Sequence, residues 1–256
     1  MWNNSDIKNL LGYTLTELSA FKKHIHPDDL PLLNAVKPGD NNIPPLRIYK
    51  KDGSMLYLEA HFRFVNYNGS PTVIGNILDI THLKNAEEKI KHIAYYDQLT
   101  QLPNRYMLND YLNKTLDPVN KEPELLAILF IDLDNFKTIN DTFGHKSGDI
   151  VLTEVSKRLS VCLRIDDILC RFGGDEFIIA LKKVGREECV SIAERVISEF
   201  RSEFVIINGN SVFTSPSIGI CLYPQDGKNA EELLMHADAA MYSAKENGRN
   251  NYLFFS

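Results

Sequence analysis

The sequence predicts an α+β protein in which helices cover a mostly antiparallel sheet, preceded by a smaller α+β domain. Residues 170–181 read CRFGGDEFIIAL, two apolar strand-like runs joined by a glycine turn, which is typical of a hairpin. From about residue 95, helical and strand-like patterns alternate, and residues 45–81 are β-rich with turn signals. At 256 residues the chain is long enough for two domains.

Composition and charge exclude several classes of protein. Hydrophobic residues make up 44% and charged residues 24%, a globular balance. The longest apolar run, LLAILFI, is too short to cross a membrane, and the start MWNNSDIKN lacks the features of a signal peptide. A net charge of −6 without a basic tract argues against a nucleic-acid partner. Four scattered cysteines without metal-ligand spacing fit small core side chains in a reducing cytoplasm.

Residues 1–82 predict the smaller domain. A helical start, SDIKNLLGYTLTEL, is followed by HIHPDDLPLL and then by two or three strands, whose turns are marked by KDGS and YNGS. His24 and His26 fit surface or capping positions better than haem ligation. We therefore expect no cofactor in this domain.

Residues 83–94 predict a connecting helix. Leu83, Ala86, Ile90 and Ile93 recur at three- and four-residue steps between polar residues. The segment is too short to establish a coiled coil by itself. A helix that is polar on most faces and joins two domains commonly pairs with its twin, so we expect a homodimer.

Residues 95–256 predict the larger domain, in which mixed helices and hairpins favour helices layered on an antiparallel sheet over a doubly wound parallel sheet. The expected helices are YMLNDYLNKTL, GDIVLTEVSKRLSVCLR, EECVSIAERVISEF and AEELLMHADAAMYSAKENG. The expected strands are LLAILFID, the two arms of the hairpin, one near FVIING, one within VFTSPSIGICLYP, and YLFF.

Carboxylates follow two of these strands. Asp132 and Asp134 come at the end of a buried strand, and Asp175 and Glu176 follow the two glycines of the hairpin turn. Asp134 fits the N-cap of a turn beginning NFKTIND. Taken alone, Asp175 and Glu176 are equally well explained as solvated turn residues.

Asp132, Asp175 and Glu176 would repel one another if brought together, unless a cation lay among them. Oxygen ligands without His or Cys suit Mg²⁺ or Mn²⁺, which commonly share their coordination with substrate phosphates. Gly173 and Gly174 would let a phosphate lie against the backbone amides of the turn. Two metal ions there could activate a hydroxyl and stabilise a departing pyrophosphate, so the pattern indicates a nucleoside triphosphate.

RFGGDEF, together with FIDLDNFKTINDTFGHKSGD, resembles the GGDEF family of diguanylate cyclases. DQLTQLPNR, SIGI and DAAMYSAKENGRN resemble further blocks of that family, in the same order. The resemblance covers residues 95–256 and implies a nucleotidyl-cyclase-like fold related to polymerase palms. It implies condensation of two GTP into cyclic di-GMP and two pyrophosphates. Gln101 departs from the family, which has glycine there, and this puts the local turn geometry in question.

The resemblance also implies roles for single residues. Asp132, with the carbonyl of Leu133 beside it, is implied as a metal ligand. Asp175 is implied as a metal-bridging carboxylate and as a candidate base for the attacking 3′-hydroxyl. Glu176 matches an essential position, and the sequence does not divide its role from that of Asp175.

Asn140 and Asp149 match the guanine-reading pair of the family. An ionised Asp only accepts hydrogen bonds, which suits the N1–H and amino group of guanine and rejects the N1 acceptor of adenine. Without the resemblance, a turn residue and a helix N-terminal acid would be the preferred interpretations. The other substrate-side positions implied are Phe136, Lys137, His145, Gly173, Gly174, Lys245 and Arg249.

RIDD, from Arg164 to Asp167, resembles the inhibitory product site of the family. Arg164 would form bidentate pairs with a phosphate or a guanine edge. The alternative is an arginine paired with a surface acid.

Residues 1–82 resemble the C-terminal portion of a PAS sensor domain through LLGYTLTEL, HPDDL, KDGS and GNILDIT, although the first strand expected ahead of them is barely present. We expect a cytoplasmic cyclase that is active as a dimer and regulated by this domain and by its product. A catalytically silent module that binds GTP or cyclic di-GMP, and a PAS scaffold with a passive output domain, are the alternatives.

Overall fold

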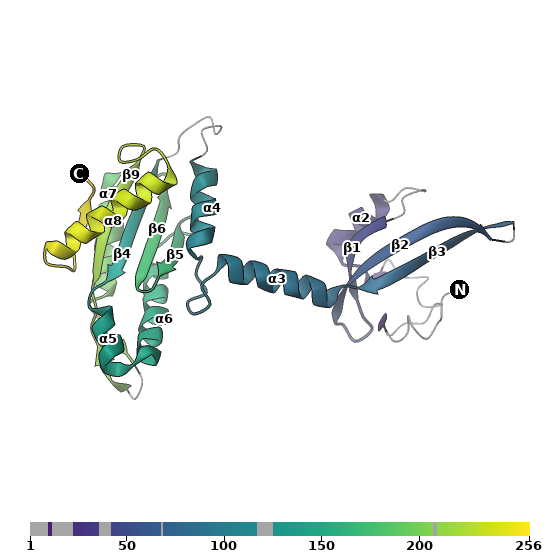
Figure 1. Cartoon of the computed structure of the whole chain (residues 1–256), viewed down its shortest axis with the longest axis horizontal. Helices are drawn as coiled ribbons and strands as arrows, with labels where there is room; N and C mark the ends of the chain where they lie inside the picture. Colours follow the sequence, from purple (N-terminus) through teal and green to yellow (C-terminus); the bar gives the residue numbers. More distant parts are fainter. Residues whose placement is uncertain (1–9, 12–22, 36–41, 68, 117–124, 207–208) are drawn as a thin grey trace. The chain divides into compact units, whose positions relative to one another are not determined.

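The structure is a computed structural model that describes residues 10–11, 23–35, 42–67, 69–116, 125–206 and 209–256. The chain forms two compact units, Met1–Ile90 and Lys91–Ser256. Helices and strands are labelled as in Figure 1. Within the described ranges, no helix combines the length and the apolar character needed to span a membrane.

The first unit contains a three-stranded antiparallel sheet, which confirms the sheet predicted for residues 1–82. KDGS forms the first turn, in which the Lys50 N–H donates to the Ser54 carbonyl oxygen (2.7 Å). Most of LLGYTLTEL lies outside the described residues. The elements are the 3₁₀ helix η2 (Pro27–Asp29), α2 (Leu30–Ala35), β1 (Asn42–Tyr49), β2 (Met55–Tyr67) and β3 (Ser70–Asp79).

Two residues of HPDDL make defined contacts: Asp29 pairs with Arg47 on β1, and His26 caps η2. The Asp29 carboxylate accepts hydrogen bonds from Arg47 Nε (3.0 Å) and Nη2 (2.7 Å), and these bonds hold the pKa of Asp29 below its ordinary value. His26 Nδ1 accepts from the Asp28 N–H (3.3 Å), which makes His26 a helix cap. The buried hydrophobic residues described here are few: Leu11, Ile25, Leu46, Ile48, Leu56 and Leu58.

The connecting helix is confirmed as α3 (Thr81–Tyr95), and none of its residues is buried. Leu83, Ile90 and Ile93 are each more than half exposed. The apolar stripe predicted from the sequence therefore contacts little within the part of the chain that the structure describes.

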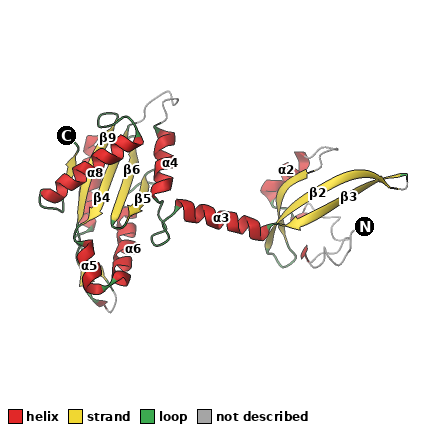
Figure 2. Ribbon diagram, in the orientation of Figure 1, coloured by secondary structure: helices red, strands yellow, loops and turns green. Residues whose placement is uncertain are grey.

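The second unit is built on a five-stranded sheet in the order β10-β9-β4-β6-β5 (Figure 2). β10 pairs with β9 in parallel, and the other neighbouring strands are antiparallel, which confirms the predicted sheet type. The strands are β4 (Leu126–Leu133), β5 (Ile168–Gly173), β6 (Glu176–Lys182), β9 (Pro216–Tyr223) and β10 (Tyr252–Phe254).

Helices cover both faces of this sheet, as alternate residues of β4 demonstrate. Leu129 packs with α6 (His145–Val161) and α7 (Arg186–Glu199), whereas Ile128 packs with α4 (Arg105–Thr115) and α8 (Ala230–Glu246). α8 crosses the strands closely (Figure 1). Gly219 permits this approach, because a Cβ there would overlap the carbonyl oxygen of Ala237.

Two segments differ from the expectation. NFKTIND, predicted as a turn, forms the helix α5 (Phe136–Phe143), because Phe136 and Ile139 both point into the core. The strand near FVIING is β7 (Phe204–Val205), which pairs with β8 (Ser211–Val212) in a separate ladder outside the central sheet.

Candidate active site

Asp132 and Glu176 lie opposite each other at the end of the central sheet. β4 and β6 are antiparallel, and their register pairs Asp132 with Glu176. Because neighbouring residues alternate between faces and Phe177 is in the core beneath α6 and α7, both carboxylates belong to the face covered by α8. Directly opposed residues have Cβ atoms about 5 Å apart. The sheet thus places two acids side by side.

The hairpin turn brings a third acid to the same strand end. Gly174 has a φ of 52°, a conformation that glycine adopts readily. The Leu133 N–H donates to the Asp175 carbonyl oxygen (3.3 Å), which fixes the turn against the end of β4. The backbone of the four predicted metal-site residues, Asp132, Leu133, Asp175 and Glu176, is therefore gathered in one place.

Burial and neighbouring negative charges disfavour ionisation of Asp132 and Glu176. Burial raises the pKa of Asp132, and the nearby Asp175 adds to this, although Lys245 opposes both. Burial likewise raises the pKa of Glu176, with the charges of Asp132 and Asp238 as further causes. Lys245 Nζ, from α8, lies 2.8 Å from Asp132 Oδ1. The lysine supplies a positive charge beside the acids.

The available oxygen donors suit a hard divalent cation whose coordination is completed by substrate. Among the described residues, no three His, Cys, Asp or Glu side chains are placed to hold a metal ion by themselves. Mg²⁺ usually takes only one or two protein carboxylates, together with water and substrate phosphates. Asp132, Glu176 and the Leu133 carbonyl supply oxygen donors of this kind.

Asp134 is not a helix cap, which corrects the expectation from the sequence. Asn135 is the N-cap residue of α5, and no side chain caps that helix. The buried Asp134 carboxylate instead accepts from Ser215 Oγ (2.5 Å), Ser217 Oγ (2.8 Å) and the Asn250 N–H (3.1 Å). It ties the end of β4 to β9 and to the segment after α8.

The sequence also gave no role to Arg171, which braces the hairpin turn. Its Nη1 donates to both carboxylate oxygens of Asp97 (3.0 and 3.1 Å). Its Nε and Nη2 donate to the Gly174 carbonyl oxygen (3.1 and 2.8 Å). Arg171 and Asp97 both lie within motifs named in the sequence analysis. They are 74 residues apart along the chain, so the sequence alone does not reveal their contact.

Asn140 lies beside Gly148, the residue before Asp149, where α5 and α6 join. A Cβ on Gly148 would overlap Asn140 Oδ1 and would lie 3.0 Å from Phe136 Cζ. Asn140 and Phe136 therefore lie against the backbone next to Asp149, whose side chain is exposed. Lys137 and His145 are exposed on the same two helices.

Arg249 and Gln101 both adopt left-handed backbone conformations. Arg249 has a φ of 62°, and its Nε lies 3.9 Å from Asp134 Oδ1, beside the predicted metal site. Gln101, at the position where glycine was expected, has a φ of 60°. Its side-chain Nε2 donates to the Gln98 carbonyl oxygen (2.7 Å), which offsets part of the strain.

Arg164 and Asp167 lie at the opposite end of the sheet from the carboxylates. They precede Ile168, which pairs with Ala180, whereas Glu176 is at the other end of β6. The Asp167 carboxylate accepts from the Arg164 N–H (2.9 Å). Arg164 Nη2 pairs with Glu188 Oε1 (2.6 Å), as the alternative interpretation of this arginine anticipated.

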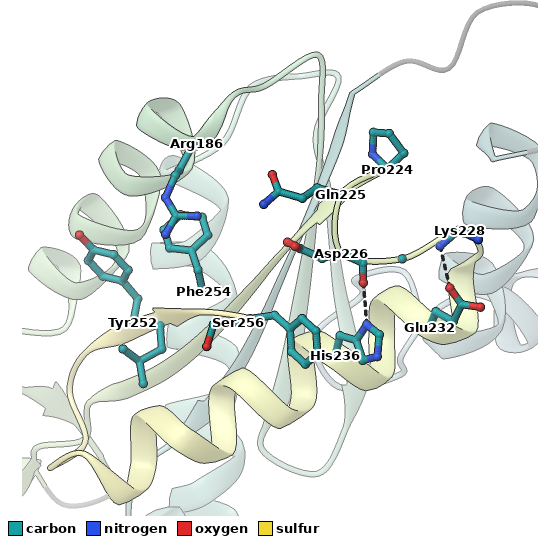
Figure 3. A pocket seen from close by; sticks show the side chains of 13 residues that line it. Arg186, Pro224, Gln225, Asp226, Lys228, Glu232, His236, Tyr252, Phe254 and Ser256 are labelled. Atoms are coloured by element: carbon teal, nitrogen blue, oxygen red, sulfur yellow. Dashed lines mark hydrogen bonds between the residues drawn. The ribbon is translucent and has the colours of Figure 1, made fainter.

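A pocket of about 790 Å³ also lies at that far end (Figure 3). Residues just after Tyr223, the last residue of β9, line this pocket. Tyr223 pairs with Leu126 at the start of β4, whereas the carboxylates are at the other end of β4. Its walls include Arg186, over the ring of Phe254 (3.7 Å), and His236, stacked on Phe255 (4.0 Å). It is a hollow separate from the carboxylate site.

Comparison with known proteins agrees with this geometry. The family described as "Diguanylate cyclase, GGDEF domain" matches residues 94–251. The bifunctional diguanylate cyclase/cyclic di-GMP phosphodiesterase MucR of Pseudomonas aeruginosa is 40% identical over 175 residues, which cover 68% of this chain and 25% of MucR. The cyclic di-GMP phosphodiesterase PdeR of Escherichia coli is 36% identical over 178 residues, 70% of this chain and 26% of PdeR.

A solved structure of the GGDEF domain of TpbB from Pseudomonas aeruginosa has the same fold, with a TM-score of 0.61 at 39% identity. The match covers 63% of this chain and 94% of that domain. The chain therefore spans a whole domain of this type but only about a quarter of the length of MucR and PdeR.

Proposed function

Because the chain belongs to the GGDEF diguanylate cyclase family, we propose that it condenses two molecules of GTP into cyclic di-GMP and two pyrophosphates. The observation that carries this proposal is the pairing of Asp132 with Glu176 at one strand end, with Asp175 in the adjoining turn. Acids that lie together beside one lysine, with Asp132 buried and the other two half-buried, are suited to a cation-bound triphosphate.

We assign Mg²⁺ or Mn²⁺ to Asp132, the Leu133 carbonyl, Asp175 and Glu176. When bound, the metal would neutralise phosphate charge and make a hydroxyl more acidic. Lys245 Nζ lies 2.8 Å from Asp132 Oδ1, and its ammonium group would contact a substrate phosphate if Asp132 held a metal ion. Arg249 is the second cation on this side, and Asp175 is the candidate base.

Asn140 and Asp149 are proposed to select guanine. Asp149 accepts hydrogen bonds from N1–H and the amino group, and the Asn140 amide donates to the acceptor edge. Phe136, which lies beside Gly148, forms a wall of the base pocket. Lys137 and His145 complete the substrate-side set.

Catalysis requires two copies of this chain. Each catalytic unit holds one carboxylate set, but ring closure needs two attacks on two α-phosphates. Two sites must therefore face each other with their substrates antiparallel. The exposed stripe of Leu83, Ile90 and Ile93 on α3 gives the homodimer an apolar seam.

Regulation is proposed at two further places. Residues 1–82 act as a PAS-like sensor without a cofactor, residues 83–94 as a helical linker, and residues 95–256 as the cyclase. Arg164 and Asp167 form a feedback site for cyclic di-GMP, well away from the carboxylates. The nucleotides that the enzyme uses and the four free, buried cysteines fit a cytoplasmic protein.

The second candidate function is a silent receptor that binds GTP or cyclic di-GMP without turnover. The likeness to the phosphodiesterase PdeR gives this candidate its support. Against it, the sequence keeps the acids and the residues proposed to read guanine, and Asp132 pairs with Glu176 in the register of β4 and β6.

Incubation of the full chain with GTP and Mg²⁺, followed by separation of the nucleotides, tests the cyclase. We expect cyclic di-GMP from the parent and a loss of at least about a hundredfold in Asp132→Asn, since the neutral amide cannot replace a metal-binding carboxylate. Glu194→Gln, an exposed change on α7, is the matched control and should keep the parent rate. Saturable GTP binding without product, in parent and control alike, would favour the receptor.

A further inference from the structure

We infer that Glu188 is an internal competitor of the product at the feedback site, so that cyclic di-GMP must displace a carboxylate of this chain before it can bind. This inference rests on the proposed feedback role of Arg164 and Asp167. It adds a residue that determines how strongly the product binds there.

The contact itself is short and spans two elements. Glu188 Oε1, in the first turn of α7, lies 2.6 Å from Arg164 Nη2, in the loop before β5. The guanidinium is 70% exposed and the glutamate side chain 31%, so a ligand in solution can reach the arginine. A phosphate or a guanine edge would use the same guanidinium donors that Glu188 occupies.

The loop and the helix are both held in place, so the pairing is built into the fold. The Asp167 N–H donates to the Arg164 carbonyl oxygen (3.1 Å), and the Asp167 carboxylate accepts from the Arg164 N–H, which closes the turn from both sides. Arg195, seven residues after Glu188 and hence on the same face of α7, donates through Nη2 to the Cys162 carbonyl oxygen. This second link holds α7 beside the loop.

Charge makes Glu188 a competitor in two ways. Its carboxylate occupies Arg164, and its negative charge repels the two phosphates of the product. Exposed ion pairs and charges a few ångströms apart in water each contribute modestly, so we expect removal of this charge to tighten product binding about three- to tenfold.

The test is equilibrium binding of cyclic di-GMP to the full chain by titration calorimetry, without GTP or Mg²⁺. Glu188→Gln, which keeps the shape and removes the charge, should bind about three- to tenfold tighter than the parent, and this difference should shrink in high salt. Glu187→Gln, the neighbouring acid in the same turn, is the matched control and should bind like the parent. Arg164→Ala should lose the binding.

Two outcomes would overturn the inference, and they are distinguishable. Equal or weaker binding by Glu188→Gln, while Arg164→Ala still loses binding, would leave the feedback site standing and remove Glu188 as its competitor. No binding by the parent or by Glu188→Gln would remove the feedback site as well. Initial cyclase rates of the same proteins, taken before product accumulates, report separately on the proposed reaction.

Discussion

At the scale of single residues, the helix corner between α5 and α6 depends on the absence of one side chain. Gly148 leaves room for the Asn140 carboxamide and the Phe136 ring directly against the backbone. Asn140, one of the two residues proposed to read guanine, is therefore placed by packing. A methyl group at residue 148 must push Asn140 aside, because the backbone of α6 cannot move without disturbing the core beneath it.

Gly148→Ala should raise the KM for GTP by about ten- to a hundredfold and weaken discrimination against ATP, because the site loses a hydrogen bond to the base. Steady-state rates with both nucleotides provide the measurement. Gly185→Ala is the control, since a Cβ there meets no atom within 4 Å and the residue has an extended φ of −96°. Unchanged KM in Gly148→Ala would show that Asn140 does not contact the base.

The residues that sequence reasoning identified and those it missed differ in one physical respect. The position of Asp132 was predictable because it ends an apolar run and the pattern along the chain locates strand ends, whereas Glu176 is the first residue of β6, after the turn. The role of Asp134 depends on Ser215 and Ser217, about eighty residues away, and no periodicity reports such a contact. The sequence favours the N-cap of a turn for Asp134, because a short motif reveals local interactions alone.

At the scale of elements, the loop after α3 and the hairpin turn form one connected structure. Arg171, on β5, joins the Asp97 carboxylate to the Gly174 carbonyl oxygen. Asp97 also accepts from the N–H and hydroxyl of Thr100 (2.8 and 2.7 Å). Burial acts to raise the pKa of Asp97, but these hydrogen bonds and the guanidinium outweigh it, and the pKa lies below its ordinary value.

Asp97→Asn should therefore destabilise the catalytic unit by about 1–3 kcal/mol at pH 7, since it removes a charge-assisted partner of Arg171. Because the folded pKa is depressed, the contribution of Asp97 is complete above its unfolded pKa and disappears as the pH falls through the folded value. Chemical denaturation at several pH values, with the exposed Asp166→Asn as control, should show the two curves converging below about pH 4. A constant difference at every pH would contradict the charge as its cause.

Whether a segment forms a helix or a strand was predictable where the hydrophobic pattern repeats over several turns. α6 and α8 each carry several turns of apolar residues on one face, and both were expected. α5 was expected to be a turn because eight residues give too few repeats of a helical period. β7 has only two residues, and its partner β8 could not be distinguished from the long strand β9 that follows it in the sequence.

At the scale of the whole molecule, the two units differ in how much structure each supplies by itself. The catalytic unit has two large hydrophobic clusters, one on each face of its sheet, whereas the described core of the first unit is a single small cluster. The connecting helix α3 buries none of its residues. The proposed homodimer would cover its apolar stripe, and isolated helices of this length gain little stability alone.

Ile90→Glu combined with Ile93→Glu should weaken dimerisation at least tenfold, because each change would place a charge in an apolar seam. Sedimentation of the full chain over a range of concentrations gives the dissociation constant, and cyclase rates over the same range give the specific activity. The parent should lose specific activity on dilution as dimers separate, and the double variant should lose it at higher concentrations. Lys91→Glu changes the net charge by the same amount on another face of α3, and it should sediment like the parent. If the double variant stayed dimeric, or if a fully monomeric parent kept its turnover per chain, α3 would not be the element that brings two active sites together.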